Sequence, residues 1–222
     1  MKSKELKILR KRLAQASRCE DPLKGIENEM RLPVETTGRV HGEVGSSDSS
    51  KPARGDKLSL EFSPSQQIAE KRYKDCLALF ETNMGEMYKN SSWGLDMEQK
   101  SAELRHDKAR FLFAIDYEET LAGFVHFRFE YDDEESPTCA VLYVYEIQIE
   151  SAYRRCGVGK RLMRIAERIA REQSMTKVML TVFKNNNQAM AFYTKTLSYD
   201  VDESSPSKFG ENVDYDILSL KL

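Results

Sequence analysis

Several features that define common protein classes are missing from this sequence of 222 residues. No window of about 18 apolar residues exists, so a membrane-spanning helix is not expected, and the lysine-rich start lacks the apolar stretch of a secretory signal. The four cysteines (Cys19, Cys76, Cys139 and Cys156) form no CxxC pair and are expected to be reduced thiols in an intracellular protein. The three histidines share no metal-ligand spacing, so we expect no metal.

The composition suits one domain with an appended tail, because 40% of the residues are hydrophobic and 32% are charged. Charge is uneven along the chain. Residues 2–18 carry seven basic side chains and one acidic one, a balance of +6, so the net charge of −2 leaves −8 for the rest. We expect a basic helical arm (1–34), a flexible Gly- and Ser-rich linker (35–57) and a globular domain (58–222). The arm could bind nucleic acid, serve as a nuclear address, or be a solvated helix face.

Hydrophobic periodicity predicts a mixed α+β domain. We interpret Ser63-Pro64 as the start of a helix that ends near Asn90. Three consecutive segments rich in β-branched and aromatic residues predict an antiparallel meander, and a later helix and strand predict one parallel crossover. The remaining expected elements are a helix at 96–105, strands at 111–117, 121–131 and 140–150, a helix at 157–173, a strand at 177–183, a helix at 187–196, and strands at 199–202 and 214–220.

The most informative segment joins a predicted strand to a predicted helix. Gly157 and Gly159, one residue apart, allow backbone N–H groups to point outward, and the following helix adds its positive end, so a pyrophosphate could bind here. The dinucleotide fingerprint is excluded because its third glycine is absent, and a Walker loop is excluded because GKS or GKT is missing. Without further context, an ordinary glycine turn before a basic helix remains an equal alternative.

Context favours a ligand-binding loop. The RxxGxG pattern from Arg154 to Gly159, followed by a strand and Asn186-x-x-Ala189-x-x-Phe192-Tyr193, resembles the GNAT superfamily of N-acetyltransferases. The segments YVYEIQIESAYRRCGVGKRL, KVMLTVFKNNNQAMAFY and MYKNSSWG more narrowly resemble the NatD-type N-terminal acetyltransferases. The resemblance implies the GNAT fold over about residues 75–222, namely a mixed central sheet flanked by helices, and the co-substrate acetyl-CoA.

The resemblance also implies two sets of binding residues. Acetyl-CoA would contact residues of the strand end, the glycine loop and the next helix start: Gln148, Ile149, Glu150, Arg154, Arg155, Cys156, Gly157, Val158, Gly159, Lys160, Arg161 and Asn186. The acceptor peptide would contact Tyr88, Trp93, Glu130, Tyr143, Tyr145, Thr181 and Tyr215. Glu130 stands where the family has an aspartate, so its reach toward the substrate differs.

Two residues are candidates for proton transfer. Simple alternation along the strand puts Glu146 on one face with Val144 and Gln148, and Tyr143, Tyr145, Ile147 and Ile149 on the other. A mid-strand carboxylate is costly unless it is paired or functional, and the resemblance places Glu146 at the family's catalytic glutamate. The alternative is a glutamate at the rim of a half-exposed sheet. Tyr193 matches a tyrosine that protonates the departing thiolate in many members, or it is a packed aromatic residue.

The implied activity is acetylation of the α-amine of histone four and histone two-A, whose tails begin Ser-Gly-Arg-Gly-Lys. Residues 130–150 contain seven acidic side chains and no basic one, which would attract such a basic tail. The four acids at 132–135 are expected to belong to a solvated hairpin turn, so Glu130 is the sharper candidate for a substrate contact. We therefore expect histone tails as partners of a monomer in the nucleus and cytoplasm, with no requirement for membrane or nucleic acid. One alternative acceptor is a lysine side chain or polyamine. An alternative of another class is a non-catalytic chromatin-binding module.

Overall fold

The computed structural model describes residues 3–19, 22–24 and 58–222, so the linker predicted at 35–57 lies outside the described residues. No helix in this described part is long and apolar enough to cross a membrane. The helices are α1 (Ser3–Ser17), α2 (Glu70–Lys89), α3 (Met97–Leu104), α4 (Val158–Glu172) and α5 (Asn187–Ala191). The strands are β1 (Ser59–Pro64), β2 (Arg110–Ile115), β3 (Leu121–Tyr131), β4 (Ala140–Ile149), β5 (Lys177–Phe183), β6 (Asp200–Val201) and β7 (Tyr215–Lys221).

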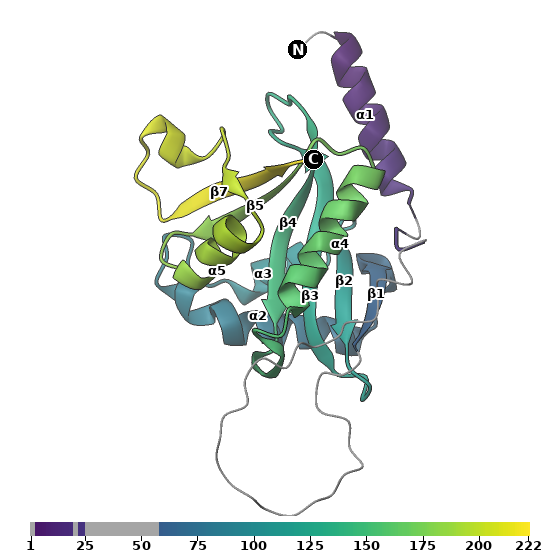
Figure 1. Ribbon diagram of the computed structural model, residues 1–222, viewed down its shortest axis with the longest axis vertical. Coiled ribbons are helices and arrows are strands. Elements are labelled where there is room, and N and C mark those ends of the chain that lie inside the picture. The colour runs from purple at the N-terminus through teal and green to yellow at the C-terminus, as the bar shows by residue number, and fades with distance from the viewer. Residues whose placement is uncertain (1–2, 20–21, 25–57) are drawn as a thin grey trace, which may run out of the picture.

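The strands form one mixed sheet in the order β1-β2-β3-β4-β5-β7-β6 (Figure 1). Strands β2, β3 and β4 pair antiparallel in chain order, which confirms the predicted meander. β4 and β5 pair in parallel, and α4 provides the crossover between them. β7 then inserts antiparallel between β5 and β6. The result is a mixed sheet with one parallel pair, flanked by helices, as the resemblance implied.

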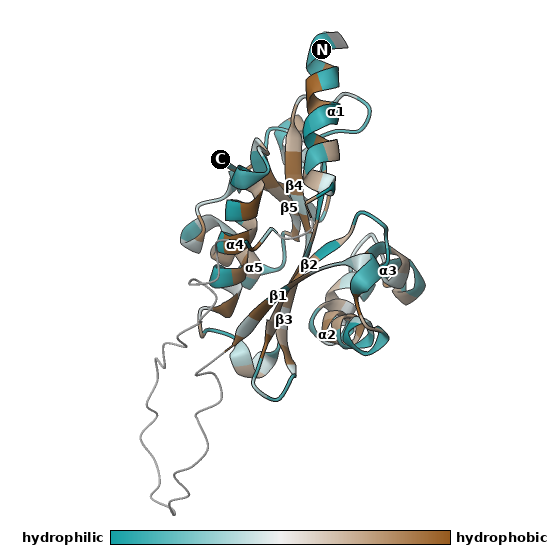
Figure 2. Cartoon of the chain, turned by 90° about the vertical axis from the view of Figure 1, so that its right-hand side faces the viewer, coloured by the Kyte–Doolittle hydropathy of each residue, from teal (hydrophilic) through white to brown (hydrophobic). Residues whose placement is uncertain are grey.

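Helices cover both faces of the sheet (Figure 2). Helix α4 lies on one face, and α2 and α3 lie on the other. Leu162 and Ile165 of α4 belong with Phe127 of β3 to one buried cluster, the α4-side cluster. Tyr73 of α2 belongs to a second cluster with Phe111 of β2. Each fully buried side chain of this size contributes about 1.5–3 kcal/mol of transfer free energy, so the two clusters hold the three layers together.

The helix start predicted at Ser63-Pro64 is wrong. These two residues end strand β1, which pairs antiparallel with β2, and α2 begins only at Glu70. β1 is an edge strand, where a proline at the last position removes no essential ladder hydrogen bond. Leu60 and Phe62, two residues apart, both pack against the α4-side cluster, as a strand requires.

The helix predicted at 187–196 is shorter and changes its winding. Helix α5 ends at Ala191 and is followed by a π-helical turn, Phe192–Thr196. The Asn186 side chain caps α5 by accepting a hydrogen bond from the backbone N–H of Ala189 at 3.1 Å. Turns of this type recur at functional sites. Here the turn carries Tyr193, which is 6% exposed.

The N-terminal helix is present as predicted and extends beyond the sheet (Figure 1). Leu9 and Ala16 are buried against the domain. Arg110 of β2 donates from Nη2 to the carbonyl oxygen of Ser17 at 2.9 Å. The basic side chains of α1, such as Lys7, are exposed. The helix therefore docks through its apolar stripe and presents its charge to solvent.

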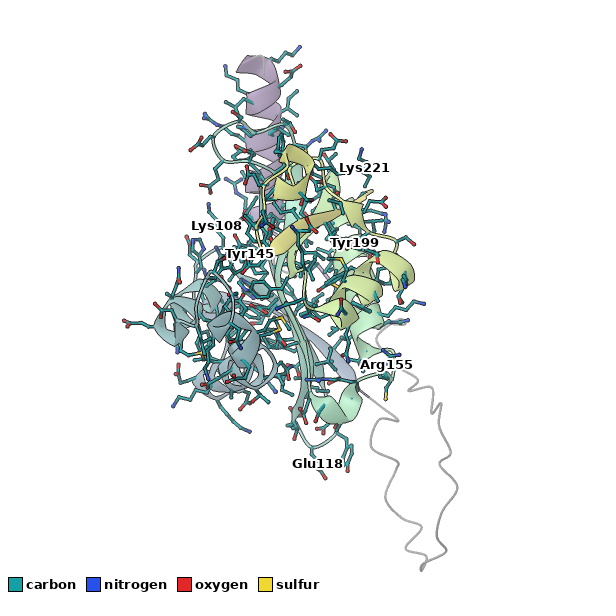
Figure 3. The ribbon with its side chains drawn as sticks, turned by 90° about the vertical axis from the view of Figure 1, so that its left-hand side faces the viewer. Lys108, Glu118, Tyr145, Arg155, Tyr199 and Lys221 are labelled. Carbon is teal, nitrogen blue, oxygen red and sulfur yellow. The ribbon has the colours of Figure 1, made fainter. Side chains whose placement is uncertain are left out.

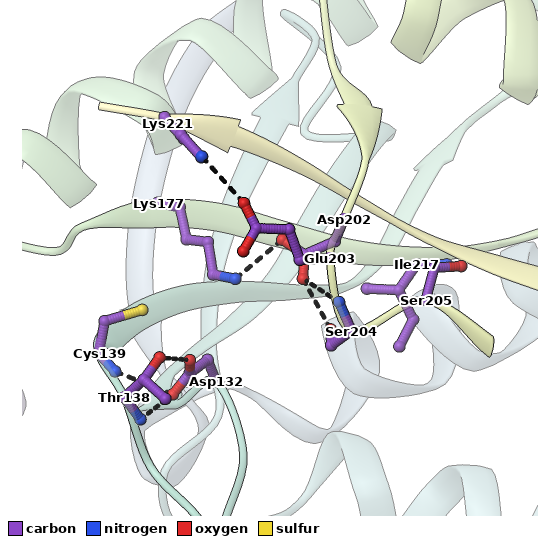
Figure 4. A network of polar contacts seen from close by, with 10 residues as sticks. All are labelled: Asp132, Thr138, Cys139, Lys177, Asp202, Glu203, Ser204, Ser205, Ile217 and Lys221. Carbon is purple, nitrogen blue, oxygen red and sulfur yellow. Dashed lines mark hydrogen bonds and ion pairs between the residues drawn. The ribbon is translucent and has the colours of Figure 1, made fainter. Parts of the chain in front are cut away.

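A network of polar contacts secures the C-terminal strands (Figure 4). Asp202 is 4% exposed and accepts a hydrogen bond from Lys177 Nζ of β5 at 2.8 Å. Burial alone raises the pKa of Asp202, but the contacts with Lys177, Ser219 and Ser204 outweigh it and hold the pKa well below its usual range. These contacts fix the segment after β6 against β5, next to β7.

Candidate active site

A cleft opens where β4 and β5 separate. Their parallel pairing stops at Val144 and Leu180, although β4 continues to Ile149 and β5 to Phe183. The cleft has a volume of about 1160 Å³ and is lined by both strand ends, α2, the start of α4 and the π-helical turn. Peptide groups of β4 that would join a parallel ladder face this space instead. A cleft of this size can hold a large cofactor-like ligand.

Strand β4 contains a bulge inside the cleft. Val144 pairs with Phe127 and Glu146 pairs with His126, so Tyr145 is an extra residue with no opposite partner on β3. The Tyr145 ring stacks on His126 with centroids 5.0 Å apart. His126 also stacks on Phe111 of the cluster under α2, and Glu146 contacts Lys100 of α3. Tyr145 and Glu146 therefore both point to the α2–α3 face of the sheet.

The bulge overturns the predicted alternation of β4. Tyr143 and Tyr145 do not share a face with Ile147 and Ile149, because the two isoleucines pack against the α4-side cluster. Tyr143 contacts Tyr145 instead, with ring centroids 5.2 Å apart. The correct sets are Val144, Ile147 and Ile149 on the α4 face, and Tyr143, Tyr145, Glu146 and Gln148 on the α2–α3 face. The extra residue thus brings the tyrosines and the carboxylate together.

Glu146 is a buried carboxylate that lines the cleft and is 6% exposed. Its Oε1 accepts a hydrogen bond from Lys100 Nζ of α3 at 2.8 Å, and its Oε2 accepts one from Gln148 Nε2 at 2.7 Å. Burial raises the pKa of Glu146, and the Lys100 ammonium opposes this shift without cancelling it. A carboxyl whose pKa is raised in this way is a stronger base than an exposed glutamate.

The glycine loop forms an anion cradle at one end of the cleft. Arg155 and Gly157 have left-handed φ angles of 64° and 82°, so the chain turns sharply into α4. Gly157 is the N-cap and provides no side-chain cap, which leaves the first N–H groups of α4 available to a ligand. Gly159 and Lys160 line the cleft beside this helix end. Arg155 lies at the surface, whereas Tyr145 lies between the α2–α3 layer and the sheet (Figure 3).

Arg154 connects the cradle to the sheet. Its Nε donates to the carbonyl oxygen of Ile149 at 3.1 Å, and its Nη2 donates to Asn83 Oδ1 of α2. Asn83 Nδ2 in turn donates to Gln148 Oε1 at 2.9 Å, and Gln148 holds Glu146. A continuous chain of hydrogen bonds therefore runs from the cradle to the buried carboxylate.

Tyr88, Trp93, Tyr145, Thr181 and Phe183 line the other end of the cleft, and further aromatic and acidic side chains lie behind them. Tyr145 donates to Glu130 Oε2 at 2.8 Å, and the hydroxyl groups of Tyr143 and Thr181 are 2.5 Å apart. Trp93, which is 46% exposed, packs on other aromatic rings with centroid distances of 4.9–5.9 Å. These partners are Tyr88, Phe183 and Tyr215. This end of the cleft has walls suited to a small group with a positive charge.

The family assignment rests on a match over more than half of the chain. The model of the Acetyltransferase (GNAT) family matches residues 73–199. The chain belongs to the GNAT acetyltransferase family. Such an enzyme uses acetyl-CoA, and the cradle fits that ligand, because backbone N–H groups at an uncapped helix start and a nearby lysine suit its pyrophosphate.

Solved structures share the fold of this GNAT acetyltransferase at low sequence identity. The PaiA N-acetyltransferase of Thermoplasma acidophilum, in complex with coenzyme A, is 15% identical with a TM-score of 0.52, over 74% of this chain and 99% of that chain. Arabidopsis thaliana NAA60, in complex with a bisubstrate analogue, is 16% identical with a TM-score of 0.53, over 74% and 99%. An acetyltransferase of Streptococcus agalactiae is 14% identical with a TM-score of 0.56, over 73% and 98%. At these identities the likeness concerns the fold alone.

The predicted site residues of this GNAT acetyltransferase fall into two groups. Three predicted acceptor residues do not line the cleft but touch residues that do: Tyr143, Glu130 and Tyr215. Four predicted cofactor residues are part of the cradle segment without lining the cleft: Glu150, Cys156, Val158 and Arg161. Of these, Val158 is buried at 1% exposure, and Glu150 accepts a hydrogen bond from the Ser151 backbone N–H. The others line it: Tyr88, Trp93, Tyr145, Glu146, Gln148, Ile149, Arg154, Arg155, Gly157, Gly159, Lys160, Thr181, Asn186 and Tyr193.

Tyr193 lines the cleft from the π-helical turn. Burial raises the pKa of its hydroxyl, and the negative charge of Glu146 raises it further. The hydroxyl therefore holds its proton at neutral pH. This state is compatible with donation to a departing thiolate, and its role as an acid stays a prediction.

Sequence reasoning missed several residues of this site. Lys100 of α3 and Asn83 of α2 bind the carboxylate network, and Phe183 completes the aromatic wall. Lys100 and Asn83 lie in helices whose polar residues look solvated in the sequence. The available signal for Lys100 was weak, namely a glutamate three residues later at Glu103, and such pairs are common on exposed helices.

Proposed function

We propose that this GNAT acetyltransferase acetylates the α-amine of proteins whose N-terminus is Ser-Gly-Arg-Gly-Lys, the start of histone four and histone two-A. The observation that carries the proposal is the bulge in β4, because it gives a buried carboxylate, Glu146, the same face as Tyr143 and Tyr145. A general base and an aromatic acceptor wall are then adjacent in one cleft, with the phosphate cradle at its other end. The resemblance to NatD-type enzymes supports the choice of acceptor.

The chemistry requires a proton acceptor next to the amine. An α-ammonium has a pKa of about 8 and becomes a nucleophile only after it loses a proton. Glu146 accepts that proton, directly or through a water, and the neutral amine attacks the thioester carbonyl of acetyl-CoA. The carbon–sulfur bond then breaks, the acetylated nitrogen releases its second proton to solvent, and the coenzyme A thiolate takes a proton. Tyr193 is positioned in the same cleft to supply that proton.

Charge and shape support a small, basic terminus as the acceptor. Glu130 lies beside Tyr145, and the segment 132–135 adds four acidic side chains, so this region attracts an arginine- and lysine-containing tail. The aromatic wall around Trp93 limits the size of the first residue. A serine followed by glycine is compatible with such a wall, whereas a bulky first residue would clash.

The test is the acetylation of matched peptides followed by mass spectrometry. We expect a free Ser-Gly-Arg-Gly-Lys peptide to be acetylated once, at its terminus, and the same peptide with a blocked terminus to stay unmodified. Acetylation of the blocked peptide at a comparable rate would identify a lysine acceptor and overturn the proposal. Glu146→Gln should lower kcat by about 10²–10⁴-fold and leave acetyl-CoA binding nearly unchanged. Unchanged turnover would remove Glu146 as the base.

A further inference from the structure

Behind the cleft, a lysine lies between two carboxylates. Lys100 Nζ donates to Glu146 Oε1 at 2.8 Å and to Glu103 Oε1 at 2.7 Å. Lys100 is 7% exposed and is not among the residues that line the cleft, whereas Glu146 is. Glu103 keeps partial contact with solvent, with 28% of its side chain exposed. Lys100 can therefore act on a substrate only through Glu146.

The position of Lys100 is tightly defined. Its ammonium lies 4.7 Å from the ring centroid of Phe80 and 5.4 Å from that of Tyr88, in addition to its two carboxylate contacts. An ammonium has three N–H donors, and here two of them have carboxylate acceptors while the aromatic rings of Phe80 and Tyr88 face the same group. The free energy of burying this charge is offset by the two ion pairs, and the pKa of Lys100 lies above its usual value for that reason, although burial alone would lower it.

The other groups that face Glu146 do not replace this cation. Gln148 contributes a neutral donor to Oε2. His126 of β3 is fully buried and neutral, because burial and the nearby Arg128 and Lys100 lower its pKa well below its usual range. Arg128 is directed elsewhere, with Nη2 donating to the Glu103 carbonyl oxygen at 2.7 Å. Tyr88 and Tyr193 are protonated phenols whose pKa values burial raises. In the described part of the chain, Lys100 is the cation that pairs with Glu146.

We propose that Lys100 is a positioning residue that keeps Glu146 ionised and aimed into the cleft, and that Glu103 weakens this effect by sharing the lysine. The inference rests on the proposed role of Glu146 as the base. Without Lys100, a carboxyl in this buried position would take up a proton near neutral pH and could no longer accept one from the substrate ammonium. Without the Glu103 carboxylate, Lys100 would form an ion pair with Glu146 alone. The repulsion between the negative charges of Glu103 and Glu146 would also be removed, so the ionised form of Glu146 would be more stable.

The two substitutions therefore have effects of opposite sign. Lys100→Met, which keeps an unbranched side chain out to the ε position and removes the charge, should raise the pKa of Glu146 by about 1–3 units. Glu103→Gln should lower it. The acidic limb of the pH profile of kcat/KM should move in the same directions, and each unit of upward shift should reduce the rate on that limb about tenfold. Lys100→Arg should restore the wild-type limb, which a purely structural role of the lysine would not require.

The pKa of Glu146 is measured directly by ¹³C NMR titration of the glutamate carboxyl signals in the full chain, with Glu146→Gln identifying the signal. An upward shift in Lys100→Met and a downward shift in Glu103→Gln support the proposal. The same pKa in folded Lys100→Met as in the wild type overturns it. If Lys100→Met does not fold, Glu103→Gln and Lys100→Arg decide, and a Glu103→Gln titration that is unchanged or shifted upward overturns the proposal.

The titration does not depend on the acceptor, so it separates this inference from the proposed function. A wild-type enzyme that leaves the free peptide terminus unmodified contradicts the proposed function, while the NMR shifts still test the role of Lys100. Conversely, terminal acetylation with an acidic limb that moves in neither Lys100→Met nor Glu103→Gln contradicts the inference alone.

Discussion

Replacing Gly123 with alanine tests how closely β3 and β4 must approach beside the cleft. Gly123 pairs with Ile149, and a Cβ at this position would lie 2.8 Å from the carbonyl oxygen of Gln148 and 2.6 Å from Ile149 Cδ1. The isoleucine side chain can rotate, but the carbonyl is backbone, so β4 must shift by about 0.6 Å to reach ordinary contact. Overpacking of this kind costs about 1–3 kcal/mol. Because Gln148 holds Glu146, the shift should also lower kcat.

Thermal unfolding measures the cost. A loss of about 2 kcal/mol lowers Tm by about 4–8 °C in a domain of this size. Gly85 in α2 is the matched control, because a Cβ there would lie 3.6 Å from Glu81 Cγ and 3.7 Å from Leu95 Cδ2, which are ordinary distances. Gly85→Ala should raise Tm slightly, since a glycine inside a helix costs about 0.5–1 kcal/mol relative to alanine. A Gly123→Ala variant with the Tm and kcat of the wild type would refute the close approach.

Two further predictions concern the contacts around the C-terminal strands. Asp202→Asn breaks the buried pair with Lys177 and should lower the free energy of unfolding by about 3 kcal/mol near neutral pH. The pKa of Asp202 is depressed in the folded protein, so its ionised form contributes to the free energy of unfolding above the unfolded-state pKa of about 4. That contribution is lost progressively as the pH falls below this value. The free energies of unfolding of the wild type and Asp202→Asn, measured by denaturant titration, should therefore converge in acid. Asp214→Ala removes acceptors of the Ser92 backbone N–H at 2.7 Å and of its hydroxyl at 3.0 Å. The neighbouring Trp93 should then move, so the KM for the Ser-Gly-Arg-Gly-Lys peptide of the proposed function should rise a few-fold, with kcat and acetyl-CoA binding unchanged. An unchanged KM would contradict the idea that Asp214 positions Trp93.

Hydrophobic periodicity was sufficient to predict the type and position of an element where that element buries one regular apolar face. Strand β5 has the predicted bounds, Lys177–Phe183, and the three meander strands follow the predicted order. Local sequence signals gave a wrong prediction where the same residue types are compatible with both a helix start and a strand end. Ser63-Pro64 has the residue types of a helix start, and only its pairing with β2, a segment far away in the sequence, makes it the end of an edge strand.

The glycine loop at one end of the cleft was predictable as a sharp turn into a helix, because two glycines at the start of an amphipathic helix have a local physical meaning. The carboxylate end of the cleft depends on contacts between elements. Lys100 lies in the polar helix α3, in a sequence that is typical of a solvated surface, and becomes buried only because α3 packs against the sheet opposite Glu146. Asn83 is half-buried for the same reason through α2. No local pattern distinguishes these two polar residues from their exposed neighbours.

The bulge in β4 is the clearest case of information that local sequence does not contain. Residues 143–149 alternate regularly between two residue sets, and that pattern predicts an unbroken strand with Glu146 and Tyr145 on opposite faces. Pairing with β3 decides otherwise, because His126 opposes Glu146 while the next β3 residue, Phe127, opposes Val144. One unpaired residue rotates the strand at the point where it leaves β5. The same irregularity therefore brings the Glu146 carboxylate to the face of Tyr143 and Tyr145, and a strand that obeyed its own alternation would have separated them.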